Sequence, residues 1–196
     1  MRSVFLCLFA AAFVGLPPAA FAQGADQSRS TPVATETNPS IDSLFGELKR
    51  ERKEHAARRI ADRITDRWRD SGSASIDVMM SWADEAMKAQ KWGVALDFLD
   101  RVIYLAPDFA EGWNRRATLH FMMKNYRKSM ADIDRTLRLE PRHFGALVGM
   151  AQILNETGRK ALALRAYERA LDVYPMMRSA QTQFATLSDE LAGDGI

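Results

Sequence analysis

Cysteine is almost absent from this 196-residue chain, which contains only Cys7. A single cysteine cannot form a disulfide within the chain, so covalent links do not hold the fold together. The three histidines, His55, His120 and His143, lie far apart, and none belongs to a short-spaced cluster of metal ligands. Because a metal site needs several ligands at short spacing, we expect neither a bound metal nor another cofactor.

Motifs for catalysis are lacking as well. The chain has no Gly-x-x-x-x-Gly-Lys loop for a phosphate and no nucleophile in a recognisable turn. Carboxylate pairs such as Asp132 and Asp134 lie at helical spacing beside Arg135, which is typical of a solvated helix face with weak ion pairs. We therefore expect a protein that is not an enzyme.

The chain also lacks a large excess of positive or negative charge. The chain has 27 Lys and Arg against 25 Asp and Glu, which gives a formal net charge of +2. This balance provides no general electrostatic attraction toward nucleic acid. We expect no nucleic-acid partner.

Only one long apolar run is present, Val4–Leu16 near the amino terminus. Arg2 precedes the run, two prolines follow it, and Ala20-Phe21-Ala22 matches an A-x-A cleavage site. This order is typical of a secretory signal peptide over residues 1–22, cleaved after Ala22. A retained membrane anchor is the alternative, disfavoured because the run is short and ends in prolines. We expect an exported, periplasmic chain with no transmembrane segment in its mature form.

Proline is scarce but regularly spaced. Pro107, Pro141 and Pro175 stand 34 residues apart, and this period indicates an all-α array of stacked helical hairpins. Units aligned on these prolines share small side chains where two helices must approach closely. The units are Ile76–Phe109, Ala110–His143 and Phe144–Met177; position 8 holds Ala83, Ala117 and Ala151, and position 20 holds Ala95, Ser129 and Ala163.

These residues resemble the tetratricopeptide repeat family over roughly Ile76–Met177. The segments 106–117 and 140–147 are similar to short exported tetratricopeptide proteins of alphaproteobacteria, some of which are associated with cell-envelope integrity. The resemblance implies a noncatalytic adaptor that binds a peptide or protein client of the envelope. Three residues depart from the family pattern: Arg116 at position 7, His120 at position 11 and Lys160 at position 17.

The segments outside the three units are interpreted from composition and apolar spacing. Residues 23–40 are polar and carry two prolines, which predicts a disordered tether. Residues 41–75 predict a degenerate first hairpin that caps the amino-terminal end of the array, with one long or kinked helix as the alternative. Residues 178–191 predict a solvating carboxy-terminal helix.

The resemblance also places a binding groove on the first helices of the units. In this family these helices line the concave side through roughly positions 2, 5, 6, 9, 12 and 13. The chaperone-binding subfamily needs basic residues there, and Met80 and Asp84 do not supply them. The candidate partner-binding residues, some of which alternatively pack the array, are Asp77, Met80, Asp84, Glu111, Asn114, Arg115, Thr118, Phe121, Gln152 and Asn155.

A second candidate surface is the basic segment Lys49–Arg69. It contains nine basic and four acidic residues, so it predicts peripheral contact with anionic envelope material such as lipid headgroups, lipopolysaccharide or wall polymer. The alternative is a solvated face whose arginines pair with aspartates along the helix. The residues of this stripe are Arg52, Arg59, Arg63 and Arg67.

Overall fold

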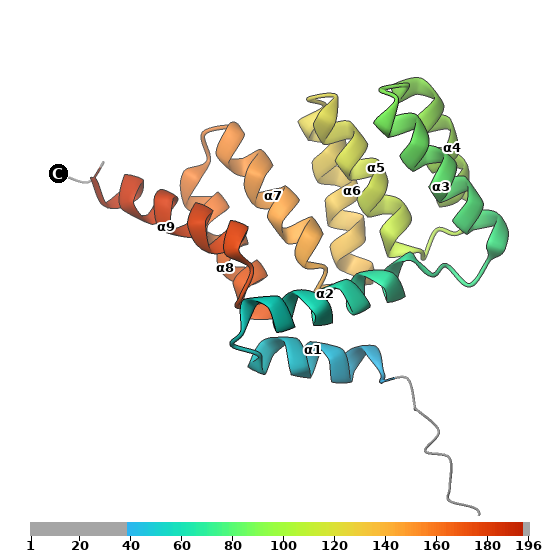
Figure 1. The fold of residues 1–196 in the computed structure, drawn as a ribbon. Coiled ribbons are helices and arrows are strands. Elements are labelled where there is room, and N and C mark those ends of the chain that lie inside the picture. The colour runs from blue at the N-terminus through green and yellow to red at the C-terminus, as the bar shows by residue number, and fades with distance from the viewer. Residues whose placement is uncertain (1–38, 194–196) are drawn as a thin grey trace, which may run out of the picture. The chain divides into compact units, whose positions relative to one another are not determined.

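A computed structural model describes residues 39–193 of the chain, so the expected signal peptide and most of the expected tether lie outside the described residues. The described part is helical throughout, in accordance with the expected all-α array (Figure 1). Its nine helices are α1 (Ile41–Arg50), α2 (Glu54–Arg69), α3 (Ala74–Lys88), α4 (Trp92–Leu105), α5 (Ala110–Met122), α6 (Tyr126–Leu139), α7 (Phe144–Glu156), α8 (Lys160–Val173) and α9 (Arg178–Gly193).

The helices α3–α4, α5–α6 and α7–α8 form three hairpins with the same turn. Each turn has three residues, and its middle residue adopts a left-handed backbone: Gln90 has φ 55°, Lys124 has φ 58° and Gly158 has φ 74°. In the first turn the Gln90 N–H donates to the Met87 carbonyl and the Lys91 N–H to the Ala86 carbonyl. This Schellman motif satisfies the last carbonyls of the helix and fixes the direction in which the chain returns.

Small side chains let the two helices of each hairpin approach closely, as the residues at positions 8 and 20 of the aligned units predict. Ala83 and Ala95 are both fully buried in the first hairpin, and Ala151 and Ala163 are in the third. In the second hairpin a hydroxyl replaces one methyl, and Ser129 Oγ donates to the Ala117 carbonyl at 2.7 Å. The polar atom in this contact is therefore satisfied where it is buried.

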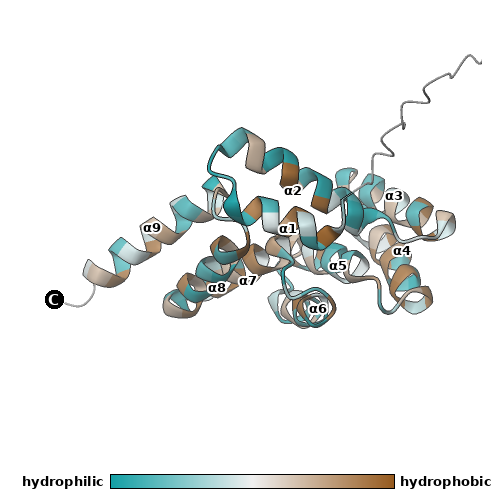
Figure 2. Cartoon of the chain, turned by 90° about the horizontal axis from the view of Figure 1, so that it is seen from below, coloured by the Kyte–Doolittle hydropathy of each residue, from teal (hydrophilic) through white to brown (hydrophobic). Residues whose placement is uncertain are grey.

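The amino-terminal segment forms a hairpin, but it lies elsewhere than expected. The apolar residues of α1 and α2, including Leu48, Ile64 and Trp68, pack against Phe144 and Tyr174 at the start of α7 and the end of α8. Figures 1 and 2 show α1 and α2 running across the ends of the array helices. The expectation that residues 41–75 cap the array by stacking on its amino-terminal end is therefore corrected.

Two turns explain this different position. Between α1 and α2 the helix is interrupted where the Glu51 carboxylate accepts the N–H groups of Arg52 and Lys53, at 2.8 and 2.7 Å. Between α2 and α3 the loop has no proline; Gly72 takes a left-handed φ of 73°, and Ser71 donates to the Asp77 carboxylate. These turns differ from the repeated ones, so the hairpin is directed away from the stacking position.

Helix α9 closes the other end of the array by packing on α8. Ala180 and Leu187 are buried there, and Phe184 is partly buried beside them. The side-chain amide of Gln181 donates to the Pro175 carbonyl at 2.7 Å, which fixes the entry into the helix. Among the described helices, none combines the length and hydropathy needed to cross a membrane.

Candidate functional site

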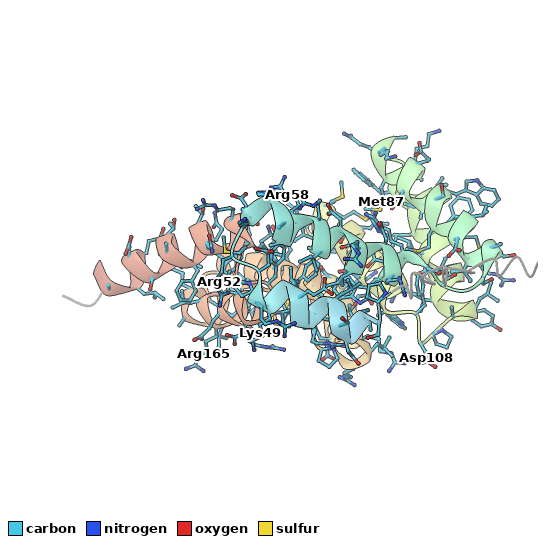
Figure 3. The ribbon with its side chains drawn as sticks, turned by 60° about the horizontal axis from the view of Figure 1, so that its bottom comes forward. Lys49, Arg52, Arg58, Met87, Asp108 and Arg165 are labelled. Atoms are coloured by element: carbon cyan, nitrogen blue, oxygen red, sulfur yellow. The ribbon has the colours of Figure 1, made fainter. Side chains whose placement is uncertain are left out.

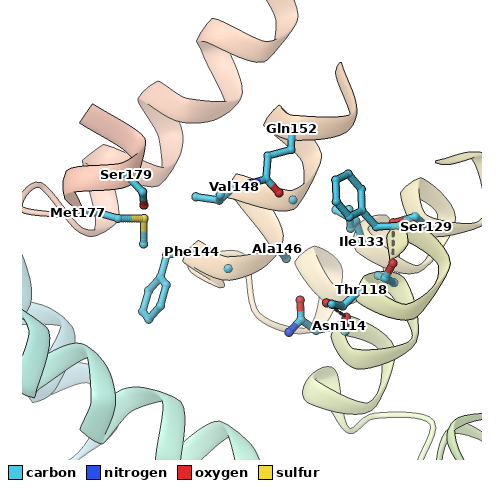
Figure 4. A pocket seen from close by; sticks show the side chains of 14 residues that line it. Asn114, Thr118, Ser129, Ile133, Phe144, Ala146, Val148, Gln152, Met177 and Ser179 are labelled. Atoms are coloured by element: carbon cyan, nitrogen blue, oxygen red, sulfur yellow. Dashed lines mark hydrogen bonds between the residues drawn. The ribbon is translucent and has the colours of Figure 1, made fainter. Parts of the chain in front are cut away.

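A groove lies between α5, α7 and the start of α9. Its first hollow has a volume of about 310 Å³ and an apolar floor that includes Ile133 and Ala146 (Figure 4). Its polar side chains are amides and hydroxyls, which can bond to a peptide backbone without carrying charge. They belong to Asn114, Thr118, Gln152 and Ser179, whereas the Ser129 hydroxyl is buried and donates to the Ala117 carbonyl.

The groove continues toward the end of α7 and along α9. A second hollow, of about 460 Å³, shares Phe121, Gln152 and Ser179 with the first. Asn155, Glu156 and Tyr167 line this second part, together with Thr182 and Gln183 of α9. The two hollows adjoin through the residues they share, so they form one continuous surface.

The structure brings five of the ten candidate binding residues to this groove. Asn114, Thr118, Phe121 and Gln152 line the first hollow, and Asn155 lines the second. Thr118 and Gln152 are exposed to solvent. The Asn114 amide donates to Glu111 at 3.0 Å, so part of its hydrogen-bonding capacity is already used inside the protein.

The three candidates on α3 lie away from the two hollows. Met80 is only 8% exposed and packs in the core between α3 and α4. Asp77 accepts from Ser71 in the α2–α3 loop, and Asp84 pairs with Arg115 at 3.2 Å. The prediction that α3 shares the client groove is not supported by this geometry, because these side chains hold the fold.

Glu111 and Arg115 also form contacts inside the fold. Glu111 is 4% exposed, and its carboxylate contacts His143 Nε2 at 3.1 Å and Arg115 at 2.9 Å. His143 Nδ1 accepts the Ala146 N–H, so the ring proton lies on Nε2 and is donated to Glu111. Burial alone would raise the pKa of Glu111, but the His143 hydrogen bond and the Arg115 charge outweigh it and lower that pKa.

A second polar cluster lies on another face, between α4, α5 and α6. Arg116 binds Asp132 with two hydrogen bonds, at 2.8 and 2.7 Å, and reaches Asp100 at 2.6 Å. Asp132 is only 4% exposed, so its interpretation as part of a solvated face was wrong. The arginine at position 7 therefore replaces apolar packing by an ion pair that joins three helices.

His120 lies beside this cluster in an unsatisfied environment. Its Nδ1 atom is buried without a hydrogen-bond partner, and its Nε2 atom is 3.9 Å from Asp132. Burial lowers the pKa of His120, because desolvation of the imidazolium outweighs the attraction of the Asp132 carboxylate. Within residues 39–193, no group of three or more potential ligand residues is arranged to hold a metal ion.

Comparison with known proteins decides the family, although no family model matches the chain. A TPR repeat-containing protein of Rhizobium etli is 55% identical to it over 154 residues, covering 79% of this chain and 76% of that protein. The chain belongs to the tetratricopeptide repeat family. This assignment agrees with the 34-residue period and with the three hairpins.

Solved tetratricopeptide structures share the fold. The first TPR of Spaghetti (RPAP3), bound to an HSP90 peptide, is 20% identical with a TM-score of 0.57, covering 60% of this chain and 95% of that one. The TPR2B domain of yeast Sti1, in a complex with an Hsp70 peptide, is 18% identical with a TM-score of 0.55, covering 60% and 99%. At such identities the similarity establishes the fold of the repeats alone.

The tetratricopeptide frame locates groove residues that the sequence analysis missed. The helix α9 was expected only to solvate the end of the array, yet Ser179, Thr182 and Gln183 line the groove. Extending the 34-residue frame by one unit places these three residues at positions 2, 5 and 6, which are groove positions in the family. The signal was therefore present, and α9 acts as the first helix of an incomplete fourth repeat.

The four arginines of the basic stripe in this tetratricopeptide protein differ in their contacts with the rest of the chain. Arg52 and Arg59 are exposed, and Figure 3 shows Arg52 with Lys49 near the α1–α2 turn. Arg63 pairs instead with Glu47 of α1 at 3.7 Å, and Arg67 donates to the Pro39 carbonyl at 3.4 Å. Arg52 itself donates to the Lys49 carbonyl at 3.2 Å, so three of the four candidate arginines contribute to the hairpin segment.

Proposed function

We propose that this tetratricopeptide protein is a noncatalytic adaptor of the periplasm that binds an extended segment of a protein client between α5, α7 and α9. The observation that carries the proposal is the continuous groove, in which an apolar floor is bordered by amides, hydroxyls and the carboxylate of Glu156. Family membership supports protein binding as the general activity. The expected signal peptide supports the compartment, and the resemblance to short exported proteins supports a role in envelope integrity.

The chemistry of the groove indicates what kind of segment it accepts. An extended peptide needs partners for its backbone groups, which Gln152, Asn155 and Thr182 provide. Small apolar side chains fit the floor formed by Ile133, Ala146 and its neighbours. None of the described residues that line the first hollow is titratable, which favours an uncharged stretch of the client there. Glu156 lines the second hollow, so a basic side chain of the client can be accepted at that end.

The peptide complexes of the Spaghetti and Sti1 domains support a groove of this kind as a peptide site. The recognised group must differ here. Positions 5 and 9 of the first repeat hold Met80 and Asp84, and positions 2 and 6 of the third repeat hold Gly145 and Gly149. A terminal carboxylate therefore finds no basic clamp at these positions, and an internal, uncharged stretch of the client is the better match.

Photo-crosslinking in living cells tests the adaptor function. A crosslinking residue at Thr118 or Gln152 is expected to capture one discrete client, which mass spectrometry then identifies. Arg138, whose side chain is exposed on α6, serves as the control position. The variant Val148→Asp should abolish the adduct while circular dichroism still shows a folded helical protein. Equal labelling from Thr118 and Arg138, or adducts that survive Val148→Asp, would exclude the groove as the binding site.

Peripheral binding to anionic envelope material is the second candidate function. It is favoured by the exposed positions of Arg52 and Arg59 on a hairpin that lies over the array. Cosedimentation with vesicles of anionic phospholipid should then decrease with salt, and Arg52→Ala with Arg59→Ala should weaken it several-fold. Arg165→Ala on α8, also exposed, is the matched control. Binding that the Arg52→Ala/Arg59→Ala double variant leaves unchanged would exclude the stripe.

A further inference from the structure

The outer face of the first repeat, on α3 and α4, exposes apolar side chains. Val78 is 45% exposed, Trp82 53% and Val94 46%. Trp82, Val94 and Phe98 line a shallow hollow of about 560 Å³, whose border includes Glu85 and Lys91. We call the surface formed by Val78, Trp82, Val94 and Phe98 the end face.

The repeat frame shows what such a face normally contacts. Trp82 and Phe98 occupy positions 7 and 23 of the first repeat, with ring centroids 5.4 Å apart. The same positions of the second repeat hold Arg116 and Asp132, and Arg116 also bonds Asp100 of the preceding repeat. Position 7 therefore points toward the repeat that comes before it.

Position 3 behaves in the same way. In the second repeat it is Gly112, where a Cβ atom would lie only 2.9 Å from the side chain of Val102 in the preceding repeat. In the first repeat the same position is Val78, which remains exposed. Positions 3 and 7 of the second repeat thus contact the repeat before it. In the first repeat the same positions hold apolar side chains that are exposed on the end face.

The end face is open because the preceding hairpin is docked elsewhere. The helices α1 and α2 place their apolar residues against Phe144 and Tyr174 instead of against α3 and α4. Nothing else among the described residues precedes α3 in the chain. Exposed apolar clusters bordered by polar residues are typical of surfaces that bind another protein.

We propose that the end face is a self-association surface, on which the same face of a second copy of the chain packs about a twofold axis. This inference is independent of the client groove, which lies between other helices. It predicts a dimer whose two grooves both remain open, because Trp82 and Val94 lie outside the residues that line them.

Charge favours a second copy as the occupant. The border of the hollow carries one acid, Glu85, and one base, Lys91. A twofold axis can therefore place opposite charges near each other, whereas a strongly charged partner finds no complementary field. The net charge of the chain is only +2, so the copies repel each other weakly.

The opposite end of the array, where Leu162 and Leu191 line a hollow of their own, is a poorer match for the end face than a second end face is. The exposed residues of α9 are largely polar and include Gln183, Asp189 and Glu190. An apolar end face gains little from packing on such a helix, and it gains most from covering an identical apolar face. The isologous pairing closes after two copies and does not extend into a fibre.

The size of the end face sets the expected strength. A 15-residue α3 is about 22 Å long. Two helices, each about 10 Å in diameter, lie about 8–10 Å apart, so the pair is about 19 Å wide and its footprint is on the order of 400 Å². Stable complexes bury about 800 Å² on each partner. The dimer should therefore be weak and reversible, with a dissociation constant in the micromolar range.

Sedimentation velocity of the purified chain tests the proposal. Over a concentration range of about a hundredfold, centred on the micromolar region, the wild type should pass reversibly from monomer to dimer. Trp82→Glu should raise the dissociation constant at least tenfold with unchanged circular dichroism. Leu162→Glu on α8, where the side chain is similarly exposed at 47%, is the matched control and should leave association unchanged.

A second measurement identifies the contacting face directly. A photo-crosslinking benzoylphenylalanine in place of Trp82 should yield a covalent dimer, whereas the same residue in place of Leu162 should not. A wild type that stays monomeric throughout, or a dimer unaffected by Trp82→Glu, overturns the proposal. An adduct from position 82 to a different protein in cells, with a monomeric purified chain, assigns the face to that protein instead. Client capture from Thr118 should persist in Trp82→Glu, so each proposal can fail alone.

Discussion

Trp68 of α2 stacks on His143 at the start of α7, with ring centroids 4.1 Å apart and an angle of 11° between the planes. The same imidazole binds Glu111 through Nε2 and caps α7 through the Ala146 N–H. One side chain thus connects the amino-terminal hairpin, the start of α5 and the start of α7. The position of the hairpin and the buried charge of Glu111 depend on each other.

Removal of the stacked ring should release the hairpin. Trp68→Ala deletes contacts with His143, Phe144 and Phe45, and such a truncation costs about 3–5 kcal/mol in a packed core. Urea unfolding should show this loss, and hydrogen exchange should show reduced protection in α1 and α2 with little change in α3 and α4. Arg69→Ala, an exposed neighbour, should change stability by less than about 0.5 kcal/mol. A cost for Trp68→Ala equally small would contradict the role of the stack.

The buried carboxylate predicts an acid-sensitive fold. Because the pKa of Glu111 lies below its usual value of 4.5, its ionised form stabilises the folded state above pH 4.5. That contribution is lost as the pH falls through the lowered pKa. Glu111→Gln should cost about 3 kcal/mol at neutral pH, and the difference from the wild type should shrink in acid. Thermal unfolding over a pH series measures this, and a difference that stays constant into acid would contradict the role of the ionised Glu111.

His120 should be a site where substitution stabilises the protein. Its pKa is lowered by burial, so the unfolded chain binds a proton more readily and stability falls as the pH decreases below about 6.5. His120→Leu removes the unsatisfied Nδ1 atom and should gain about 1–2 kcal/mol, with the gain increasing below this pH. Denaturant titrations at pH 8 and pH 6 test it. An equal or lower stability of the leucine variant at both pH values would show that the histidine is satisfied.

Two acids on α6 should differ sharply in their coupling to arginine. Asp132 is buried and bound by Arg116 through two hydrogen bonds, whereas Asp134 pairs with Arg138 on the exposed surface. A double-mutant cycle should give about 1.5–3 kcal/mol for Arg116 with Asp132. The exposed pair should give about 0.5 kcal/mol or less. Equal coupling energies in the two cycles would disagree with the burial of Asp132.

Much of the fold could be predicted because its determinants are local and periodic. Pro107, Pro141 and Pro175 mark the turns between repeats, and the small residues facing each other in every hairpin fix how closely the helices pack. The position of the hairpin α1–α2 could not be predicted in this way. It depends on the contact of Trp68 with His143, and nothing periodic in the sequence relates these two residues.

The groove was predictable to the extent that the repeat frame applies. The frame predicts Thr118 and Gln152 on the surface of the groove, where both lie. Ser179 and Thr182 also occupy groove positions of the frame, but the sequence analysis predicts their helix only as a solvating cap. Glu111 was misplaced for a different reason. Its burial is decided by its partners His143 and Arg115, and the order of residues along one helix does not reveal such partners.

The docked hairpin also changes how the chain must fold. In a simple array every contact joins neighbouring repeats, so the ends can unravel independently and formation proceeds stepwise. Here Arg142 bonds Asp42 across 100 positions of the chain, and Arg178 bonds Glu54 across 124. Such long loops close late and slow the folding reaction, because the chain loses the conformational entropy of the loop before the long-range contacts stabilise it. Because the apolar residues of α1 and α2 also pack on Phe144 and Tyr174, we expect the first helices and the third repeat to unfold together.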